Sequence, residues 1–512
     1  MSRILILLSL AFSSLLVQAQ TGTLTGYLID KATGDGVPFA NVVLVGTSIG
    51  GTTSDNGRFE IEEIPAGEHR LKVSLLAYQQ KIVNFELLTN QTLNLGSISL
   101  QTDMLGLDEV VVSGTMKEVS RLESSVPVEV YSKVFFRANP TPSIFESLQN
   151  VNGVRPQLNC NVCNTGDIHI NGLEGPYTMV LIDGMPIVSG LSTVYGLTGI
   201  PQSLIERVEI VKGPASTLYG SEAVGGMINI ITKNPSSAPR AAVDVFATSW
   251  GEVNTDVGLK FNVGTKVSSL LGVNYFNYQN PIDNNNDGFT DLTLQDRISV
   301  FNKINIERKD NRVFTLAGRY LYEDRWGGEM DWTDDYRGGD IIYGESIYTN
   351  RWEVFGLYQL PLKETVNFQF SANGHSQNSV YGNVLYLADQ YIGFGQLTWN
   401  KKVNRHDMLL GSSYRYTYYD DNTPATFNAI ADTNQASIIH LPGLFIQDEI
   451  SLNEFNKVLL GVRYDYNSLH GNIFTPRINY KWNTANKKNV LRISAGNGYR
   501  VANVFTEDHA AL

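Results

Sequence analysis

The sequence has little cysteine, little proline and few basic side chains. Two cysteines among 512 residues, Cys160 and Cys163, cannot build a disulfide framework. Seventeen prolines are too few for a disordered chain. Lys and Arg number 39 against 51 Asp and Glu, so the net charge of −12 argues against general binding of nucleic acid.

Long apolar runs and enzyme motifs are also missing. After the first twenty residues, apolar runs are only as long as a strand, so any membrane insertion would have to use a closed barrel of strands. There is no nucleophile elbow, no P-loop, no G-x-G-x-x-G that opens a helix and no H-E-x-x-H. We therefore expect a protein that is not an enzyme and that requires no cofactor.

The N-terminal segment has the composition of a secretory signal peptide. Arg3 precedes an apolar run at residues 4–17, and small residues at positions 17 and 19 favour cleavage after Ala19. An uncleaved membrane anchor is the alternative, but the run is shorter than about 20 residues and three serines interrupt it. We expect residues 1–19 to be removed on export.

Residues 20–103 alternate short strand-like runs with turn signals, which predicts a small β-sandwich. Residues 26–47 (GYLIDKATGDGVPFANVVLVGT) and 52–61 (TTSDNGRFEI) resemble the carboxypeptidase-regulatory-like domain that precedes many outer-membrane receptors of the Bacteroidetes type. Because no catalytic constellation is present, the resemblance implies an accessory domain.

Residues 117–235 carry the most specific motifs. Buried strands of four to six residues alternate with glycine-bearing turns, which predicts a compact mixed α/β domain. The segments are 146–154 (ESLQNVNGV), 167–172 (DIHING), 179–186 (MVLIDGMP), 205–214 (IERVEIVKGP) and 218–232 (LYGSEAVGGMINIIT). In this order they closely resemble the plug domain of TonB-dependent outer-membrane receptors.

Residues 104–116 contain a strand-like heptapeptide, LDEVVVS. It is interpreted either as an ordinary linker strand or as an extended peptide that adds to the sheet edge of another protein. The resemblance places it where the family keeps its TonB box and implies that TonB, powered by an inner-membrane motor, pulls on it. The residues expected to bind TonB are Leu107, Asp108, Glu109, Val110, Val111 and Val112.

Residues 236–512 show alternating segments near ten residues long, with Tyr, Trp and Phe near their ends. This pattern is typical of a transmembrane antiparallel β-barrel, the alternative being a large soluble β-sandwich array. About 13 segments are present, whereas plugged outer-membrane barrels have 22 strands. We expect a mainly β protein in which the barrel is incomplete and the chain is truncated at its C-terminus.

The plug resemblance also implies an apical loop that faces the binding cavity. The C-x-x-C of this loop is expected to form a local disulfide; ligation of metal or substrate by the cysteines and His169, and free thiols, are alternatives. The substrate-binding residues expected here are Arg155, Asn159, Cys160, Asn161, Cys163, Asn164 and His169.

Residues 283–291 (DNNNDGFTD) match the start of a calcium loop. Asp283, Asn285, Asp287 and Asp291 are the candidate ligands of a structural calcium ion, although Leu294 stands where an EF-hand has its bidentate Glu, and an ordinary turn is the alternative. Residues 324–332 and 414–421 combine aromatic and acidic side chains. Both segments are expected to be loops that bind ligand or belong to the interfacial aromatic girdle. For residues 414–421 the girdle is favoured.

The resemblance implies TonB-dependent import of a scarce metal chelate, most simply a ferric siderophore. Cobalamin, haem, another metal complex or an oligosaccharide are alternative substrates, and an adhesion or signalling receptor is the competing class. The expected location is the outer membrane, with the N-terminal domain and the plug base facing the periplasm. Expected partners are TonB and its motor, the chelate, outer-membrane lipid and, as an open alternative, a surface lipoprotein.

Overall fold

The computed structural model describes residues 21–31, 33–45, 47, 49–75, 78, 80–101, 110–160, 165–188, 191, 197–485 and 489–501. The chain divides into two compact units, Met1–Glu109 and Val110–Leu512, and each is described by itself. Within the described ranges, no helix has both the length and the apolar character needed to cross a membrane.

The first unit is a β-sandwich, as expected. Its sheets have the strand orders β4-β1-β7 and β3-β2-β5-β6, with β1 antiparallel to β4 and parallel to β7. Alternate side chains of the strands point inward and form one core, which includes Leu24, Leu28, Val42, Phe59 and Leu71. The strands are β1 (Thr21–Asp30), β2 (Asn41–Leu44), β3 (Gly50–Thr52), β4 (Arg58–Pro65), β5 (Gly67–Ser74), β6 (Lys81–Leu87) and β7 (Thr92–Leu100).

The second unit begins with the plug, a mixed domain around a five-stranded sheet of order β10-β15-β16-β13-β14. The apolar runs at 179–182, 208–211 and 228–232 fall in β13, β15 and β16. The strands are β8 (Val110–Val111), β9 (Val119–Ser120), β10 (Glu129–Ser132), β11 (Val154–Cys160), β12 (Thr165–Ile170), β13 (Thr178–Ile182), β14 (Met185–Val188), β15 (Ile205–Lys212) and β16 (Gly226–Thr232). The helices are α2 (Lys133–Ala138), α3 (Ile144–Ser147), η1 (Leu148–Asn150), η2 (Gly175–Tyr177), η3 (Gln202–Leu204) and α5 (Ser216–Tyr219).

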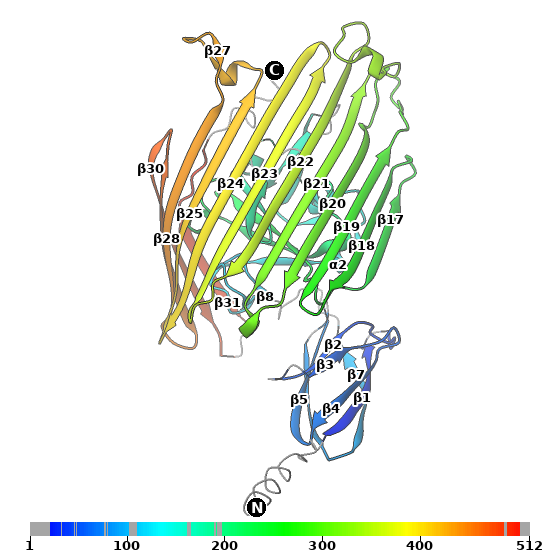
Figure 1. Cartoon of the computed structure of the whole chain (residues 1–512), viewed down its shortest axis with the longest axis vertical. Helices are drawn as coiled ribbons and strands as arrows, with labels where there is room; N and C mark the ends of the chain where they lie inside the picture. Colours follow the sequence, from blue (N-terminus) through cyan, green and yellow to red (C-terminus); the bar gives the residue numbers. More distant parts are fainter. Residues whose placement is uncertain are drawn as a thin grey trace, which may run out of the picture. The chain divides into compact units, whose positions relative to one another are not determined.

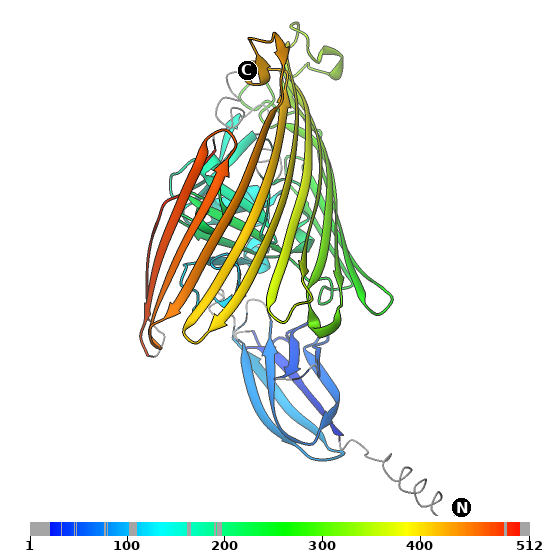
Figure 2. The same ribbon diagram turned by 60° about the vertical axis from the view of Figure 1, so that its left-hand side comes forward.

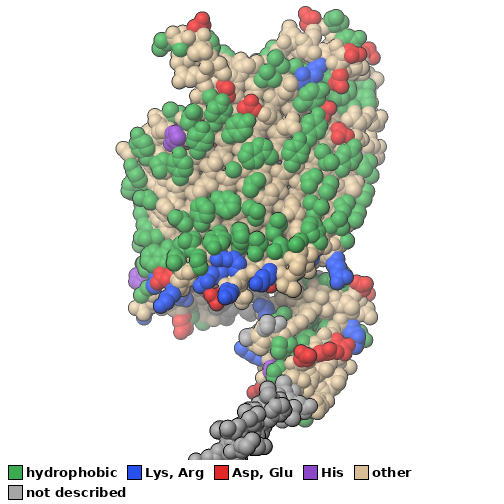
Figure 3. Space-filling model, in the orientation of Figure 1, with side chains coloured by type: hydrophobic (Ala, Val, Ile, Leu, Met, Phe, Trp, Pro, Cys, Tyr) green, Lys and Arg blue, Asp and Glu red, His purple; other side chains and the backbone are tan. Residues whose placement is uncertain are grey.

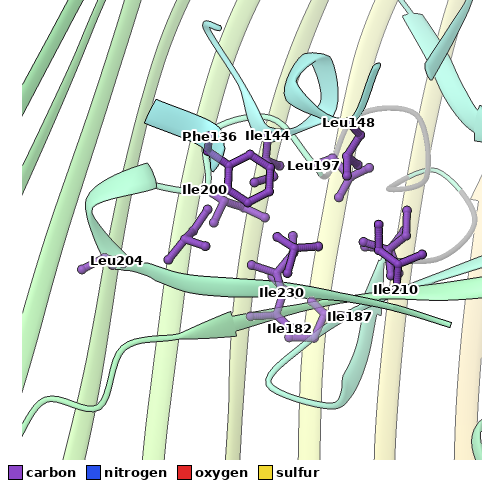
Figure 4. Packing of buried hydrophobic residues seen from close by; sticks show 14 of the residues in the cluster. Phe136, Ile144, Leu148, Ile182, Ile187, Leu197, Ile200, Leu204, Ile210 and Ile230 are labelled. Carbon is purple, nitrogen blue, oxygen red and sulfur yellow. The ribbon is translucent and has the colours of Figure 1, made fainter. Parts of the chain in front are cut away.

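The plug core lies between this sheet and the short helices that cover it. Figure 4 shows Phe136, Ile144 and Leu148 on one side of the cluster and Ile182 and Ile230 on the other. The same cluster continues into the surrounding strands through Leu270, Phe301, Ala317 and Phe355. Plug and barrel wall therefore share buried apolar surface.

The rest of the unit is one 13-stranded antiparallel sheet, which curves around the plug (Figures 1 and 2). Each strand pairs with its neighbour in sequence, and only the short β26 and β27 intervene between β25 and β28. The number of strands agrees with the 13 expected segments. The strands are β17 (Ala241–Ala247), β18 (Val253–Val263), β19 (Val267–Tyr278), β20 (Leu294–Ile306), β21 (Phe314–Gly328), β22 (Gly344–Gln359), β23 (Thr365–Tyr381), β24 (Val384–Val403), β25 (His406–Asp421), β26 (Phe427–Asn428), β27 (Thr433–Asn434), β28 (Ser437–Ser451), β29 (Asn456–Asn467), β30 (Gly471–Asn483) and β31 (Val490–Gly496).

Outward side chains of this sheet are largely apolar (Figure 3). On β24, Leu387, Tyr391 and Leu397 are exposed, whereas Gln390 and Gln396 between them are buried against the lumen. The strands thus alternate apolar-out and polar-in, as a lipid-facing barrel wall requires.

The connections differ between the two ends of the sheet. The longest, residues 279–293, 329–343 and 422–436, lie at one end, where η5 (Asp334–Tyr336) and η6 (Pro424–Thr426) also occur. At the other end, connections such as 264–266 and 404–405 are short, and the 307–313 connection includes η4 (Lys309–Asn311). The expectation of loops at 324–332 and 414–421 is wrong in part, because β21 runs to Gly328 and β25 to Asp421. Strand alternation continues through these aromatic and acidic residues.

Candidate functional site

The segment expected to bind TonB is partly described, and that part is docked on the plug. Val110 and Val111 form β8, which pairs with β9 of the same chain. Val111 is fully buried in a cluster with Val126, Met179 and Leu181, whereas Val110 is half exposed. Leu107, Asp108 and Glu109 lie outside the described residues.

Glu209 on β15 holds the chain just after β8. Its Oε2 accepts hydrogen bonds from the backbone N–H groups of Val112 at 3.0 Å and Ser113 at 2.9 Å. Its Oε1 lies 2.8 Å from Arg207 Nη2. Ser113 makes two more hydrogen bonds. Its Oγ accepts from Asn229 Nδ2 at 2.9 Å, and its carbonyl oxygen accepts from the Tyr219 hydroxyl at 3.1 Å. Ser113, the residue directly after the expected TonB box, is therefore hydrogen-bonded to β15, β16 and α5.

Buried ion pairs attach the plug to the barrel wall. Glu353 lies between Arg319 and Arg351, with contacts of 2.6 Å from Arg319 Nη2 and from Arg351 Nε. Arg351 Nη2 donates to the carbonyl of Ile187 at 2.7 Å, and Arg319 Nη1 donates to that of Thr198 at 3.3 Å. Glu353 thus bridges the two arginines, so each guanidinium has an ionic partner while it binds plug backbone, although two guanidinium groups share one carboxylate.

A second attachment is built on the turn between β13 and β14. Asp183 and Gly184 have positive φ angles of 49° and 78°, as an Asp-Gly two-residue hairpin turn requires. The Asp183 carboxylate accepts from Thr232 N at 2.8 Å and lies 2.9 Å from Lys303 Nζ on β20. The turn therefore fixes one end of the plug sheet to the wall.

The expected apical loop is the hairpin of β11 and β12. Arg155 pairs with His169 across the hairpin, and His169 Nε2 lies 2.8 Å from Asp167 Oδ1. Arg155 is exposed, whereas the His169 side chain is only 16% exposed, so this face offers mainly a cation to solvent. The side chains of Asn159 and Cys160, and the whole of Asn161, Cys163 and Asn164, lie outside the described residues. The disulfide stays a prediction.

The expected calcium ligands form a hydrogen-bonded turn. Asp283 accepts from the backbone N–H groups of Asp287 at 3.2 Å and Gly288 at 2.9 Å. Asp291 accepts from the backbone N–H of Asn284 at 2.8 Å, and Asn285 Nδ2 donates to Asp287 at 2.9 Å. In the described part of the chain, no group of three or more His, Cys, Asp or Glu side chains is arranged to hold a metal ion. Calcium binding at this turn stays a prediction.

Sequence reasoning missed Glu209 and the wall ion pairs. The signal available for the wall was a repeated pattern of opposite charges two residues apart, Arg351 with Glu353 and Glu323 with Arg325. In a strand such residues share a face, and charged side chains on the lumen face of a barrel need partners. The signal for Glu209 was weaker, since a lone carboxylate in an apolar strand does not indicate its partner.

A curved wall of 13 strands with a folded domain bound inside it defines the class of plugged barrel proteins. Two family models match this architecture, the TonB-dependent Receptor Plug Domain at residues 120–227 and the TonB dependent receptor-like beta-barrel at 254–508. A third, the CarboxypepD_reg-like domain, matches residues 24–112. The chain belongs to the family of TonB-dependent receptors, which are outer-membrane receptors and not enzymes.

Individual relatives are distant. An iron-regulated outer membrane virulence protein of Vibrio cholerae is 25% identical over 345 residues, 62% of this chain and 49% of that protein. The ferric enterobactin receptor PirA of Pseudomonas aeruginosa is 28% identical over 261 residues, 48% of this chain and 34% of the relative. The chain therefore spans half or less of the length of these curated relatives.

Solved structures show the same fold. The siderophore receptor PirA from Pseudomonas aeruginosa has a TM-score of 0.55 at 17% identity, and the match covers 74% of this chain and 63% of PirA. The structure of the FpvAI–pyocin S2 complex gives a TM-score of 0.61 at 12% identity, covering 80% and 65%.

Proposed function

We propose that this chain is part of a receptor that imports a ferric siderophore across the outer membrane with energy delivered through TonB. The observation that carries the proposal is the attachment of Val110–Val112, the described part of the expected TonB box, to the plug inside a barrel wall. The relatives support the substrate class, because one is named as iron-regulated and another as a ferric enterobactin receptor. Cobalamin, haem, other metal complexes and oligosaccharides are the alternative substrates.

The attachment explains how a pulling force could act. Force on residues 107–112 reaches Glu209 through two backbone hydrogen bonds, and reaches β16 through Ser113 and Asn229. These strands lie side by side in the middle of the five-stranded plug sheet. Pulling therefore acts on the centre of the plug, and no nucleotide site is needed in this chain.

The two ends of the barrel wall support a direction of transport. Outer-membrane barrels have short periplasmic turns and longer extracellular loops. Lys117, shortly after the expected box, forms an ion pair with Asp407 beside the short 404–405 turn. We place this end in the periplasm, where TonB can reach the box, and the 279–293, 329–343 and 422–436 connections outside. Arg155 and His169 on the β11–β12 hairpin are proposed to contact substrate, together with residues 159–164.

The test is growth of a strain that lacks the gene, complemented with the full-length receptor, on single limiting sources. The sources are ferric siderophores, haem, cobalamin, copper and oligosaccharides. Val111→Pro removes a backbone N–H and fixes φ, so it should break β8 and abolish rescue. Val110→Thr changes a half-exposed side chain on the same strand and should rescue fully.

Energised iron import is supported if the deletion strain does not grow on one ferric siderophore and if only the parent receptor and the Val110→Thr variant restore that growth. Both variants must reach the outer membrane in equal amounts. Rescue by Val111→Pro at normal abundance contradicts the proposed route, and equal growth on every source points to adhesion or signalling instead.

A further inference from the structure

The outer face of the barrel wall, which meets lipid, contains a hollow of about 520 Å³. The hollow extends across neighbouring strands from Val366 on β23 to Phe474 on β30, and all of its lining comes from the wall. Most of the lining side chains are apolar, and Leu397, Leu444 and Ile446 among them are exposed. We name this hollow the wall groove. Concave apolar surfaces of this kind bind apolar parts of ligands.

A small side chain forms the floor of the wall groove. Ser412 on β25 stands directly opposite Leu397 of β24 and Leu444 of β28. Tyr464 and Phe474 continue the same cross-strand row, and their ring centroids lie 5.9 Å apart. Residues in such a row point to the same face of a sheet, so the small serine leaves a depression between large apolar side chains. A hydrocarbon chain fits this depression.

One end of the wall groove reaches the end of the barrel where the connections are short. Val366 and Trp399, which pair across β23 and β24, line the groove there. Two residues further along these strands, the Glu364 carboxylate accepts from Trp399 Nε1 and forms an ion pair with Lys401. Tryptophan is enriched where the hydrocarbon core meets the headgroups. This end of the groove therefore lies at headgroup level.

Cations border the same end of the wall groove. Lys363, one residue before Glu364, and Lys402, next to Lys401, are exposed, and no ion pair joins either lysine to another described residue. Arg405 in the following turn is also exposed, and its Nη1 donates to the uncharged carbonyl of Leu452 at 3.2 Å. Figure 3 shows Lys and Arg side chains directly below the apolar band of the wall. Exposed cations beside a bilayer attract the phosphates of anionic lipids.

The opposite end of the wall carries the opposite charge. The connections 279–293, 329–343 and 422–436 contain no lysine but several carboxylates, and acidic side chains are visible at that end in Figure 3. A phosphate would be repelled there, whereas cations face it at the short-turn end. Charge therefore selects one side of the membrane for an anionic headgroup, and the wall groove opens toward that side.

We infer that the wall groove is a binding site for an anionic glycerophospholipid. An acyl chain lies over Ser412, and the phosphate lies against Lys363, Lys402 and Arg405. A zwitterionic lipid binds more weakly, because its own cation stands close to these side chains. The site goes beyond the proposed import, since its lining belongs to the outer wall and not to the plug. In the orientation proposed above, the lipid comes from the periplasmic leaflet.

The experiment titrates the purified full-length receptor in detergent with phosphatidylglycerol or phosphatidylcholine and counts bound lipids by native mass spectrometry. Ser412→Phe fills the groove floor, and Lys363→Gln/Lys402→Gln removes two cations at its end. Thr255→Phe on the outward face of β18 is the control for the added ring. Lys266→Gln/Lys309→Gln is the control for charge, because both lysines are exposed on other connections at the same end of the barrel.

Ser412→Phe and Lys363→Gln/Lys402→Gln should each weaken phosphatidylglycerol binding at least about tenfold, while both controls bind it like the parent. Equal binding of phosphatidylcholine by the parent, or equal loss in Lys266→Gln/Lys309→Gln, would show general attraction of lipid to the wall and overturn the site. Receptor dimers that Ser412→Phe abolishes would assign the groove to a second copy of the chain instead. None of these outcomes depends on import, so failure of the proposed function is recognised separately by the growth test.

Discussion

Glu146 on α3 is a carboxylate that the folded plug favours in its protonated form. Burial is the main reason that the pKa of Glu146 is raised to about 7; the charge of Arg297 and the hydrogen bond of Ser143 oppose this rise, and the charge of Glu252 adds to it. The stability contributed by the protonated form is complete below the ordinary value of 4.5 and is lost as the pH rises through about 7. We expect the plug to unfold at a lower temperature at pH 8 than at pH 6.

Glu146→Gln should remove this pH dependence, because the amide does not ionise. The measurement is thermal unfolding of the full-length receptor at several pH values, with Glu118→Gln as a carboxylate control elsewhere in the plug. A step between pH 6 and pH 8 that persists in the Glu146→Gln variant would show that another group is responsible.

Single-residue roles were the hardest to predict from the sequence. The heptapeptide and the family resemblance predict Val111 as a TonB-binding residue, and the structure buries it in the plug. No pattern in the sequence indicates Glu209, because its role exists only through Val112 and Ser113, which lie 97 and 96 positions earlier in the chain. Local pattern gives the face of a strand, whereas such a contact depends on the packing of distant segments.

Among the elements, the barrel strands were the most predictable from the sequence. The segment Ala241–Ala247 was expected from its alternation and is β17 with the same bounds. Antiparallel neighbours in sequence order then fix the topology. Strand ends were less predictable, since Tyr414 and Tyr418 were assigned to a loop by composition although they continue the alternation of β25.

The turn between β13 and β14 is an element whose conformation limits the residues it can contain. Gly184 has φ 78°, and a Cβ there would approach nothing closer than Gln369 Nε2 at 3.9 Å. Gly184→Ala should therefore cost about 1–2 kcal/mol through backbone strain alone. Gly393→Ala on β24 is the control, because its Cβ would meet no atom within 4 Å and its backbone is not left-handed.

Urea unfolding of both variants measures this difference. If Gly184→Ala is as stable as the parent, the turn does not hold its Asp-Gly conformation, and the Asp183 attachment to Lys303 needs revision.

For the whole molecule, the division into domains followed from changes in sequence texture, but the fit of plug to barrel did not. The ion pair of Asp183 with Lys303 joins residues 120 positions apart, and the bond of Arg351 to Ile187 spans 164. These contacts depend on where the plug lies within the curved sheet.

The two compact units make a prediction for the whole molecule. Each unit has its own hydrophobic core, one around Leu24, Leu28 and Phe59 and the other around the plug sheet. Removal of residues 21–101 from the full-length receptor should therefore leave the unfolding temperature of the plug and barrel within about 2 °C of the parent, less than the shift that 1 kcal/mol gives in a domain of 150–250 residues.

Residues 21–101 produced alone should in turn unfold cooperatively. In this fragment the Tyr78 hydroxyl donates a hydrogen bond to Asp30 at 2.7 Å. Burial, the largest cause, and this hydrogen bond, the second, raise the pKa of Tyr78 from 10.0 to about 12. The free energy of unfolding of the fragment should decrease as the pH rises from 10 to 12. In the Tyr78→Phe variant this decrease should be smaller. A fragment without a cooperative transition at neutral pH, or a deletion that lowers the unfolding temperature of the barrel by 10 °C, would show that the units depend on each other.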